Sequence, residues 1–248
     1  MNRLRIDAKY PYVYETHLHT KEASACSPCS GEEMARACKE AGYTGIIVTN
    51  HFLGGNTSVD PKLGWEDWVC AFCKGYENAK REGDRIGLQV FFGWEAGFEG
   101  TESLVYGLDK NWLLAHPEIK GCTIEEQYRL VHASGGMVIH PHPFREEWYI
   151  PKIRLYPEFC DGVECANATH SSLRSKCHNN PEWDAKATQY ALKHQLPMTG
   201  GSDIHTTDLL LGGMAFPRRL TDIHDYVKAV TSREDYVLLY GNENESEA

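Results

Sequence analysis

Half of the twelve histidines of this 248-residue chain fall in short polar motifs. His17 and His19 form an H-x-H pair in the segment ETHLHT, and Asp203 and His205 form a D-x-H pair in GGSDIHT. Imidazole nitrogens together with carboxylate oxygens suit Zn, Mn or Fe, whereas they disfavour Ca and an all-thiolate zinc site. These two motifs therefore predict a site with mixed nitrogen and oxygen ligands for divalent metal ions.

Three further motifs carry side chains of the same kind, namely His51 in TNHF, Glu95 in GWE and His140 in IHPHPF. His17 and His19 would point to one side of a strand because side chains alternate along it. A carboxylate such as Glu95 can bridge two metal ions. Two ions about 3.5–4 Å apart would activate a water as hydroxide and hold both oxygens of an in-line phosphoryl displacement. The set predicts two or three divalent ions (Zn, Mn or Fe) in one site.

The elements that must position these motifs follow an alternation of short apolar runs and helical stretches, which is typical of a parallel α/β sheet. Two of the expected helices begin with capping boxes, Ser30 with Glu33 and Thr123 with Glu126. The number of strands exceeds what a small doubly wound sheet needs, so we expect a closed or distorted α/β barrel, whose active sites lie after the strands' C-terminal ends. The expected strands are 13–18, 45–49, 88–94, 103–108, 137–140, 162–164, 197–200, 213–216 and 236–240, and the expected helices are 30–42, 65–82, 123–135, 181–194 and 221–231.

Composition narrows the class of protein. A net charge of −10 argues against nucleic-acid binding through bulk positive charge, so a nucleic acid is expected only as a substrate. No stretch approaches the ~18 uncharged apolar residues of a membrane span, and no signal peptide is recognised. We expect one domain over residues 1–240, an acidic tail over 241–248, a cytoplasmic location and no membrane partner. The sequence leaves the oligomeric state open.

The series HLH, NH, GWE, IHPH and GSDIH resembles the PHP family, the polymerase and histidinol phosphatase domain family. The resemblance covers nearly the whole chain, from His17 to about Phe216. It implies a distorted (β/α)7 barrel, similar to a TIM barrel, with two or three divalent ions at its C-terminal face. It also implies an enzyme, because standalone members of the family hydrolyse phosphoesters.

The resemblance further implies roles for the motif residues. Glu95 would bridge the first ion to a second ion that His140 also binds, while His51 and His205 would bind a third ion or contact the substrate phosphate. Catalytic roles would fall to Glu95, Asp203 and His205. The complete set of implied metal ligands is His17, His19, His51, Glu95, His140, Asp203 and His205.

The chain departs from the family pattern at three places. Asn50 replaces the Asp that usually precedes His51, and an amide lends an imidazole less basicity. Cys26 and Asp109 occupy places where trinuclear members carry histidines, so they are weaker candidate ligands. Glu164, in GVECAN, is expected to support a ligand rather than to bind metal.

Phosphate recognition requires cationic or hydrogen-bonding groups near the motifs. Lys21, Arg145 and His142 are the candidates, and Arg145 suits bidentate contact with a phosphoryl group. An ordinary salt bridge is the alternative for Lys21 and Arg145, and a hydrogen bond within its loop is the alternative for His142. The pairs Cys26/Cys29 and Cys70/Cys73 are too far apart in sequence for a usual zinc site, so packed thiols are expected there.

These features favour a metal-dependent phosphoesterase that acts on a small phosphorylated substrate, with a phosphomonoester of the histidinol phosphate kind preferred. Two alternatives remain open within the sequence. One is another metal-dependent hydrolase barrel, either a TatD-type nuclease or an amidohydrolase-like enzyme, since those also begin with H-x-H after the first strand. The other is a non-catalytic metal-binding or regulatory domain.

Overall fold

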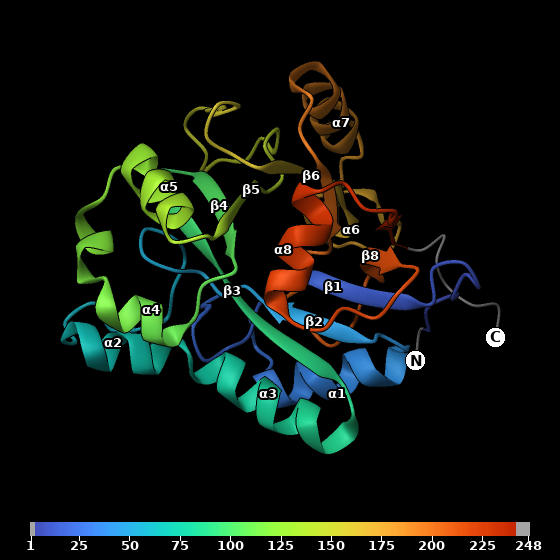
Figure 1. The fold of residues 1–248 in the computed structure, drawn as a ribbon, viewed down its shortest axis with the longest axis horizontal. Helices are drawn as coiled ribbons and strands as arrows, with labels where there is room; N and C mark the ends of the chain where they lie inside the picture. Colours follow the sequence, from blue (N-terminus) through green and yellow to red (C-terminus); the bar gives the residue numbers. More distant parts are fainter. Residues whose placement is uncertain (1–2, 242–248) are drawn as a thin grey trace.

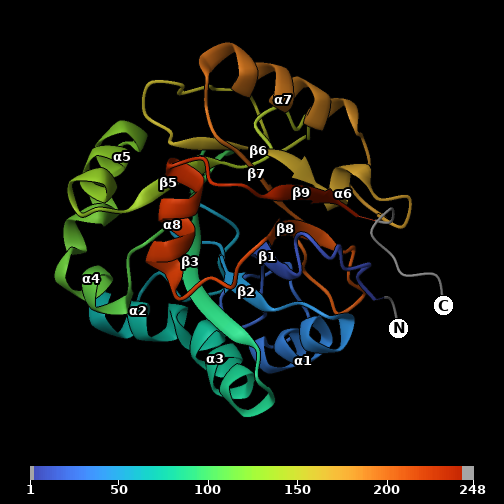
Figure 2. The same cartoon turned by 45° about the vertical axis from the view of Figure 1, so that its right-hand side comes forward.

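Nine strands within residues 3–241, the part of the chain that the computed structural model describes, form one sheet that curls into a nearly closed barrel (Figures 1 and 2). Their order across the sheet is β7-β6-β5-β4-β3-β2-β1-β8-β9. The distorted α/β barrel expected from the sequence is confirmed. In chain order the strands are β1 (Tyr12–Leu18), β2 (Gly45–Val48), β3 (Gln89–Phe98), β4 (Thr101–Tyr106), β5 (Met137–His140), β6 (Gly162–Asn167), β7 (Met198–Gly201), β8 (Gly212–Phe216) and β9 (Val237–Tyr240).

The direction of β4 decides which side chains reach the functional end of the barrel. Strands β1, β2 and β3 are parallel, as are β5, β6 and β7, whereas β4 runs antiparallel to both of its neighbours. Only Glu99 and Gly100 separate β3 from β4, and both have positive φ angles (49° and 84°). That conformation is the one a two-residue hairpin requires. The start of β4, and not its end, therefore lies at the C-terminal end of the barrel.

The helices surround the strands (Figure 2). Both predicted capping boxes are formed. The helix expected over 65–82 is instead two helices that meet at Cys73, because the first packs against α4 and the second against α1. The helices are α1 (Gly31–Ala41), α2 (Trp65–Phe72), α3 (Lys74–Ile86), α4 (Lys110–Ala115), α5 (Ile124–Ala133), α6 (Ala168–Ser171), α7 (Glu182–His194) and α8 (Ile223–Thr231), with a 3-10 turn at Pro117–Gly121.

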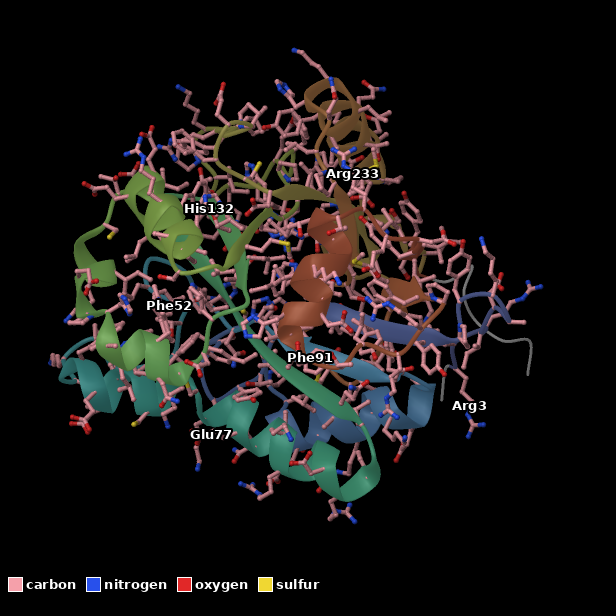
Figure 3. All side chains as sticks on the ribbon, viewed as in Figure 1. Arg3, Phe52, Glu77, Phe91, His132 and Arg233 are labelled. Atoms are coloured by element: carbon pink, nitrogen blue, oxygen red, sulfur yellow. The ribbon has the colours of Figure 1, made fainter. Side chains whose placement is uncertain are left out.

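The interior of the barrel is apolar at one end and polar at the other. Tyr14, Tyr106 and Phe216 fill the apolar end, and Tyr226 of α8 packs on them, so α8 closes this end. Phe91 stacks on Tyr14 and lies near the first turn of α8 (Figure 3). The opposite end receives the C-terminal ends of the parallel strands and is left for polar side chains.

No helix within residues 3–241 is long and apolar enough to cross a membrane. The single domain predicted over residues 1–240 stays a prediction. The predicted acidic tail lies, apart from Gly241, outside the described residues.

Candidate metal centre

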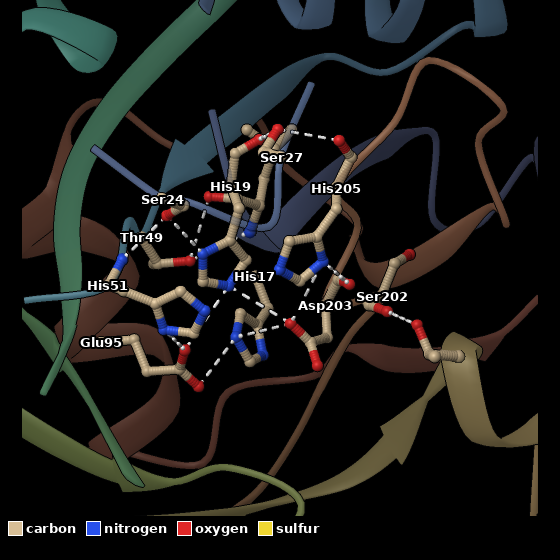
Figure 4. Close-up of polar contacts among 12 residues, drawn as sticks. His17, His19, Ser24, Ser27, Thr49, His51, Glu95, Ser202, Asp203 and His205 are labelled. Carbon is tan, nitrogen blue, oxygen red and sulfur yellow. Dashed lines mark hydrogen bonds and ion pairs between the residues drawn. The ribbon is translucent and has the colours of Figure 1, made fainter. Parts of the chain in front are cut away.

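Eight polar side chains meet at the C-terminal end of the barrel, and Figure 4 shows those of His17, His19, His51, Glu95, Asp203 and His205 pointing toward one another. They form four overlapping groups of three, and within each group the potential ligand atoms lie within 4.8 Å of one another. Six of the seven predicted ligands are among them. We call the following set the metal cluster: His17, His19, His51, Glu95, Glu102, His142, Asp203 and His205.

A bulge in β1 brings the H-x-H pair to the cluster. Tyr14 points into the barrel interior, and so does His17 three residues later, which a regular alternation of side chains does not allow. The pairing of β1 with β2 shifts register between Glu15 and Leu18, and this bulge re-aims His17. His17 Nε2 then lies 3.1 Å from Glu95 Oε1 and 3.4 Å from Asp203 Oδ1.

Hydrogen bonds on the far side of each ring fix which nitrogen faces the cluster. His17 Nδ1 contacts Glu164 Oε1 at 3.0 Å, and His205 Nδ1 donates to the backbone carbonyl of Asp203 at 2.8 Å. Because both partners only accept, Nδ1 carries the proton and Nε2 is left to bind a cation. Glu164 thus contacts a predicted ligand, and its supporting role stays a prediction.

The loop after β1 orients His19 through Ser24 and Asn50. The carbonyl oxygen of Asn50 only accepts, so Ser24 Oγ donates to it (3.1 Å) and can only accept from His19 Nδ1 (3.0 Å). His19 Nε2 is therefore the free nitrogen, 3.2 Å from Asp203 Oδ1. Asn50 also accepts from the backbone N–H of Thr20 at 2.6 Å. Asn50 thus fixes the loop that holds His19.

Gly201 in the GGSD motif provides the space for the His17–Glu164 contact. A Cβ at Gly201 would come within 2.6 Å of His17 Cβ and 2.8 Å of Glu164 Oε1. The next turn then holds Asp203 in a left-handed conformation with φ of 53°. Such strain in a non-glycine residue is typical of functional sites.

The second half of the cluster depends on the β3–β4 hairpin. Glu102, at the start of β4, lies 3.8 Å from His51 Nδ1 and 3.6 Å from His142 Nε2, and Glu95 lies between these two rings at 2.9 and 3.2 Å. Burial, together with the neighbouring charge of Glu95, raises the pKa of Glu102 to about 8. Glu102 was not among the predicted site residues. Glu-Gly is not one of the dipeptides that strongly favour a two-residue hairpin, so the sequence carried only a weak signal for an antiparallel β4.

His142, and not His140, is the residue of the IHPHPF segment that joins the cluster. His140 is the last residue of β5, is buried, and lines a small pocket together with His142, Glu102 and Arg145. The turn after β5 gives His142 a φ of 28° and turns its ring toward Glu95. The role of His140 as a metal ligand stays a prediction.

Of the two weaker candidate ligands, Cys26 and Asp109, the structure brings Cys26 toward the cluster. Hydrogen bonds from His205 and His51 outweigh partial burial and lower the pKa of the Cys26 thiol to about 6. Asp109 instead lies at the opposite end of β4, where its side chain caps α4 by accepting from the backbone N–H of Trp112 at 2.8 Å. Because β4 runs antiparallel, its last residues point away from the metal cluster.

The two cationic side chains predicted to bind a phosphate, Lys21 and Arg145, also differ in how close they lie to the cluster. Lys21 is half exposed and lies 4.0 Å from Glu33, in a surface ion pair. Arg145 is only 4% exposed, and its Nη2 lies 2.8 Å from Asp203 Oδ2. Among the thiols expected to be packed, Cys73 is buried, whereas Cys26 and Cys70 are exposed.

Four buried atoms of the cluster make no well-formed hydrogen bond among the described residues, although they lie at ion-pair distance from neighbouring cluster atoms: His17 Nε2, His19 Nε2, His51 Nδ1 and Glu95 Oε2. Buried polar atoms are normally paired, and leaving one unpaired costs about 1–3 kcal/mol. Burial alone would lower the pKa of His17, yet the carboxylates of Glu164, Asp203 and Glu95 raise it well above its usual value. Imidazole nitrogens and a carboxylate oxygen thus converge without hydrogen bonds, in a site with a surplus of negative charge. This combination fits divalent metal ions.

The fold and this cluster define an α/β barrel protein with a group of side chains that could hold divalent cations. Comparison with solved structures gives the same fold. A two-domain protein from Bacteroides vulgatus containing a predicted PHP-like metal-dependent phosphoesterase is similar with a TM-score of 0.68 and 15% identity, over 97% of this chain and 68% of that one. PsfC from Pseudomonas syringae is similar with a TM-score of 0.61 and 19% identity, over 94% and 93% of the two chains.

An amidohydrolase from Chromobacterium violaceum, solved with bound sulfate and no metal, is also similar. Its TM-score is 0.54 at 14% identity, over 77% of this chain and 87% of that chain. No protein-family model and no curated protein matches the sequence. At these identities the similarity establishes the barrel, and the chemistry has to be argued from the site.

Proposed function

We propose that this protein is a metal-dependent phosphoesterase that hydrolyses a small phosphomonoester. The observation that carries the proposal is a buried guanidinium at the edge of the metal cluster. Arg145 reaches Asp203 at 2.8 Å while the unpaired ligand atoms of the cluster lie beside it. A fixed cation next to a metal site suits a dianionic phosphoryl group, whereas a neutral amide or ester has no need of it.

The ligand groups of the cluster suggest how two or three ions would be held. His17, His19 and Asp203 form one group, and His51, Glu95 and Glu102 form another. Glu95 contacts both groups, since its two oxygens lie 3.1 Å from His17 and 2.9 Å from His51. Divalent ions bound there would act as Lewis acids toward the phosphoryl oxygens and toward an attacking water.

The chain's own residues supply the remaining functions. Asp203 presents one oxygen to His17 and His19 and the other to Arg145, so it couples the ligands to the phosphate anchor. His205 stacks on His19 and its side chain is 24% exposed, which places it at the mouth of the site beside an incoming substrate. We assign Glu95 the bridging role and Asp203 and His205 the roles of ligand and substrate contact.

The test uses the full chain loaded separately with Zn, Mn and Fe, assayed on small phosphomonoesters, on an acyl amide and on an oligonucleotide. We expect hydrolysis of a phosphomonoester that is lost on chelation and restored by the metal. Arg145→Lys should raise KM more than it lowers kcat, because lysine keeps the charge and loses the planar contact. Lys21→Ala is the matched control and should change neither value.

The other outcomes each contradict the proposal in a defined way. Hydrolysis of the amide alone would assign an amidohydrolase-like activity, and hydrolysis of the oligonucleotide alone a nuclease. A fully metallated chain that is inert on the whole panel would favour a non-catalytic metal-binding domain.

A further inference from the structure

We propose that His170 and Asp184 are positioning residues that hold the Arg145 guanidinium against the metal cluster as the anchor for a phosphoryl group. The proposal deepens the proposed function and rests on it. Neither residue belongs to the metal-ligand motifs. His170 lies in α6 and Asp184 lies in the first turn of α7, outside the strands that carry the cluster.

A continuous line of contacts joins α7 to the cluster. Asp184 Oδ1 lies 2.7 Å from His170 Nδ1, and His170 Nε2 lies 3.0 Å from Arg145 Nε. Arg145 Nη2 then lies 2.8 Å from Asp203 Oδ2. The four residues are between 0% and 6% exposed, so solvent does not compete for these contacts.

The protonation state of His170 follows from its two partners. Arginine only donates, so the Nε–H of Arg145 must be accepted by a lone pair on His170 Nε2. Nδ1 therefore carries the ring proton and donates it to Asp184. Burial and the charge of Arg145 lower the pKa of His170, which agrees with a neutral ring. The imidazole acts as a neutral hydrogen-bond acceptor for a guanidinium.

Asp184 is itself held in place. Its Oδ2 accepts from the backbone N–H of Asn167 (3.1 Å) and from Ser171 Oγ (2.6 Å). The indole of Trp183 packs edge-on against the His170 ring at 5.0 Å. With the carboxylate and the ring both fixed, His170 presents its lone pair in one direction only.

This arrangement explains how a flexible side chain on an irregular loop can be ordered. Arg145 follows β5 in a turn that has no regular secondary structure. An arginine held at Nε, with Nη2 against Asp203, presents the rest of its Nη edge to an oxyanion, and the anchor lowers the entropy lost when phosphate binds. His170 and Asp184 would therefore act on phosphate affinity rather than on metal affinity.

Two substitutions of His170 distinguish the contact made at its Nε2 position from the contact made at its Nδ1 position. In His170→Gln the amide reaches the position of Nε2 and can still accept from Arg145, whereas in His170→Asn it reaches only the position of Nδ1. The measurement is binding of inorganic phosphate to the metal-loaded full chain by calorimetry, with metal content determined on the same samples. We expect His170→Asn to weaken phosphate binding about tenfold or more, since hydrogen bonds to charged groups are the stronger kind. His170→Gln should stay within about threefold of the wild type.

The matched control is His132→Asn. His132, which is labelled in Figure 3, lies on α5 and forms a histidine–aspartate pair at 2.8 Å with Asp161, which precedes β6. Neither residue belongs to the metal cluster. This variant should leave phosphate affinity and metal content unchanged. If His170→Asn does not fold, Asp184→Asn serves instead and should weaken phosphate binding about threefold.

The outcomes separate the two proposals. Three results would each overturn the positioning role. The first is unchanged phosphate affinity in His170→Asn, and the second is loss of bound metal in that variant. The third is a further loss of phosphate affinity when His170→Asn is combined with Arg145→Ala. If the wild type binds phosphate in a His170-dependent way and yet hydrolyses no phosphoester, the proposed function fails and the positioning role stands. A metal-loaded wild type that does not bind phosphate would overturn both.

Discussion

The two ends of the barrel differ in the hollows beside them and in how their charged groups are paired. The end closed by α8 has the larger hollow, about 720 Å³, between α3, α4 and the start of β3. Its charged groups find partners nearby: Lys80 binds Asp84, and Arg219 donates to Gln89 at 2.9 Å. The other end encloses little space but contains the cluster's four unpaired buried atoms.

We therefore take the unpaired atoms, and not the size of a hollow, as the mark of the candidate functional end. A hollow whose charged groups are already paired has little charge left to attract an ionic ligand. An unpaired buried ligand atom has an energetic cost that a cation removes. Four experiments test this contrast.

The largest effect is expected from removing a ligand at the cluster end. His17→Ala and Asp203→Ala should each lower metal-dependent phosphoesterase activity by at least about a hundredfold, because even outer contacts of metal ligands are worth about 10–100-fold. His224→Ala, at the hollow, is the matched control and should retain activity and metal content. Comparable losses in all three variants would show that both ends serve the reaction.

Metal binding should stabilise the folded chain through the cluster alone. A ligand present at 100 times its Kd adds about 2.7 kcal/mol to the free energy of unfolding. For a chain of this size, that corresponds to a rise in Tm of about 5–10 °C. Thermal unfolding with added Zn or Mn, compared with unfolding in chelator, measures the rise. His17→Ala should reduce it, and an undiminished rise in that variant would place the metal elsewhere.

The two acids at the ends of β4 provide a test within one strand. Glu102→Gln removes a charge from the cluster and should weaken binding of one ion about tenfold, as measured by metal titration. Asp109→Asn at the other end keeps a good helix N-cap, so metal binding and stability should change little. Equal effects of the two substitutions would contradict the antiparallel direction of β4.

The smallest effect concerns the ion pair near α8. The hydrogen bonds from Arg218 lower the pKa of Asp225 to about 2. A lowered folded-state pKa stabilises the protein above the ordinary aspartate pKa, and this contribution is lost as the pH falls toward 2. Asp225→Asn should therefore cost less than about 1 kcal/mol at pH 7, because the pair is partly exposed, and the difference should vanish near pH 2. Chemical denaturation at several pH values measures it. A difference that grew on acidification would contradict this sign.

Much of the fold could be predicted from the sequence because its local signals for helices and strands are strong. The capping boxes at Ser30 and Thr123 fix where two helices begin, and the apolar runs fix where most strands lie. The H-x-H and D-x-H motifs both follow strands that were predicted to be parallel. Because parallel strands end at one edge of a sheet, the side chains of the two motifs could be expected to lie close together. The break at Cys73 was not predicted, because the two halves of that segment pack on different helices.

The sequence predicted less about the second half of the site, since that depends on strand direction and on turns. Asp109 and Glu102 lie at opposite ends of one strand, and only pairing with β3 decides which of them faces the cluster. His140 and His142 both follow from the same motif, and the backbone conformation after β5 decides that the second ring reaches Glu95. The pair behind Arg145 joins residues 25 and 39 positions away in the chain, a distance over which no local pattern acts.

The types and order of the candidate ligand residues and the barrel class could be read from the sequence, because they follow from side-chain chemistry and from hydrophobic periodicity. The tertiary structure alone decided which acid joins the cluster, which histidine turns toward it and what holds Arg145. Those outcomes depend on the bulge in β1, the hairpin between β3 and β4 and the docking of α7 on β6. Each of them is a contact between distant segments, and its geometry is fixed only when the barrel closes.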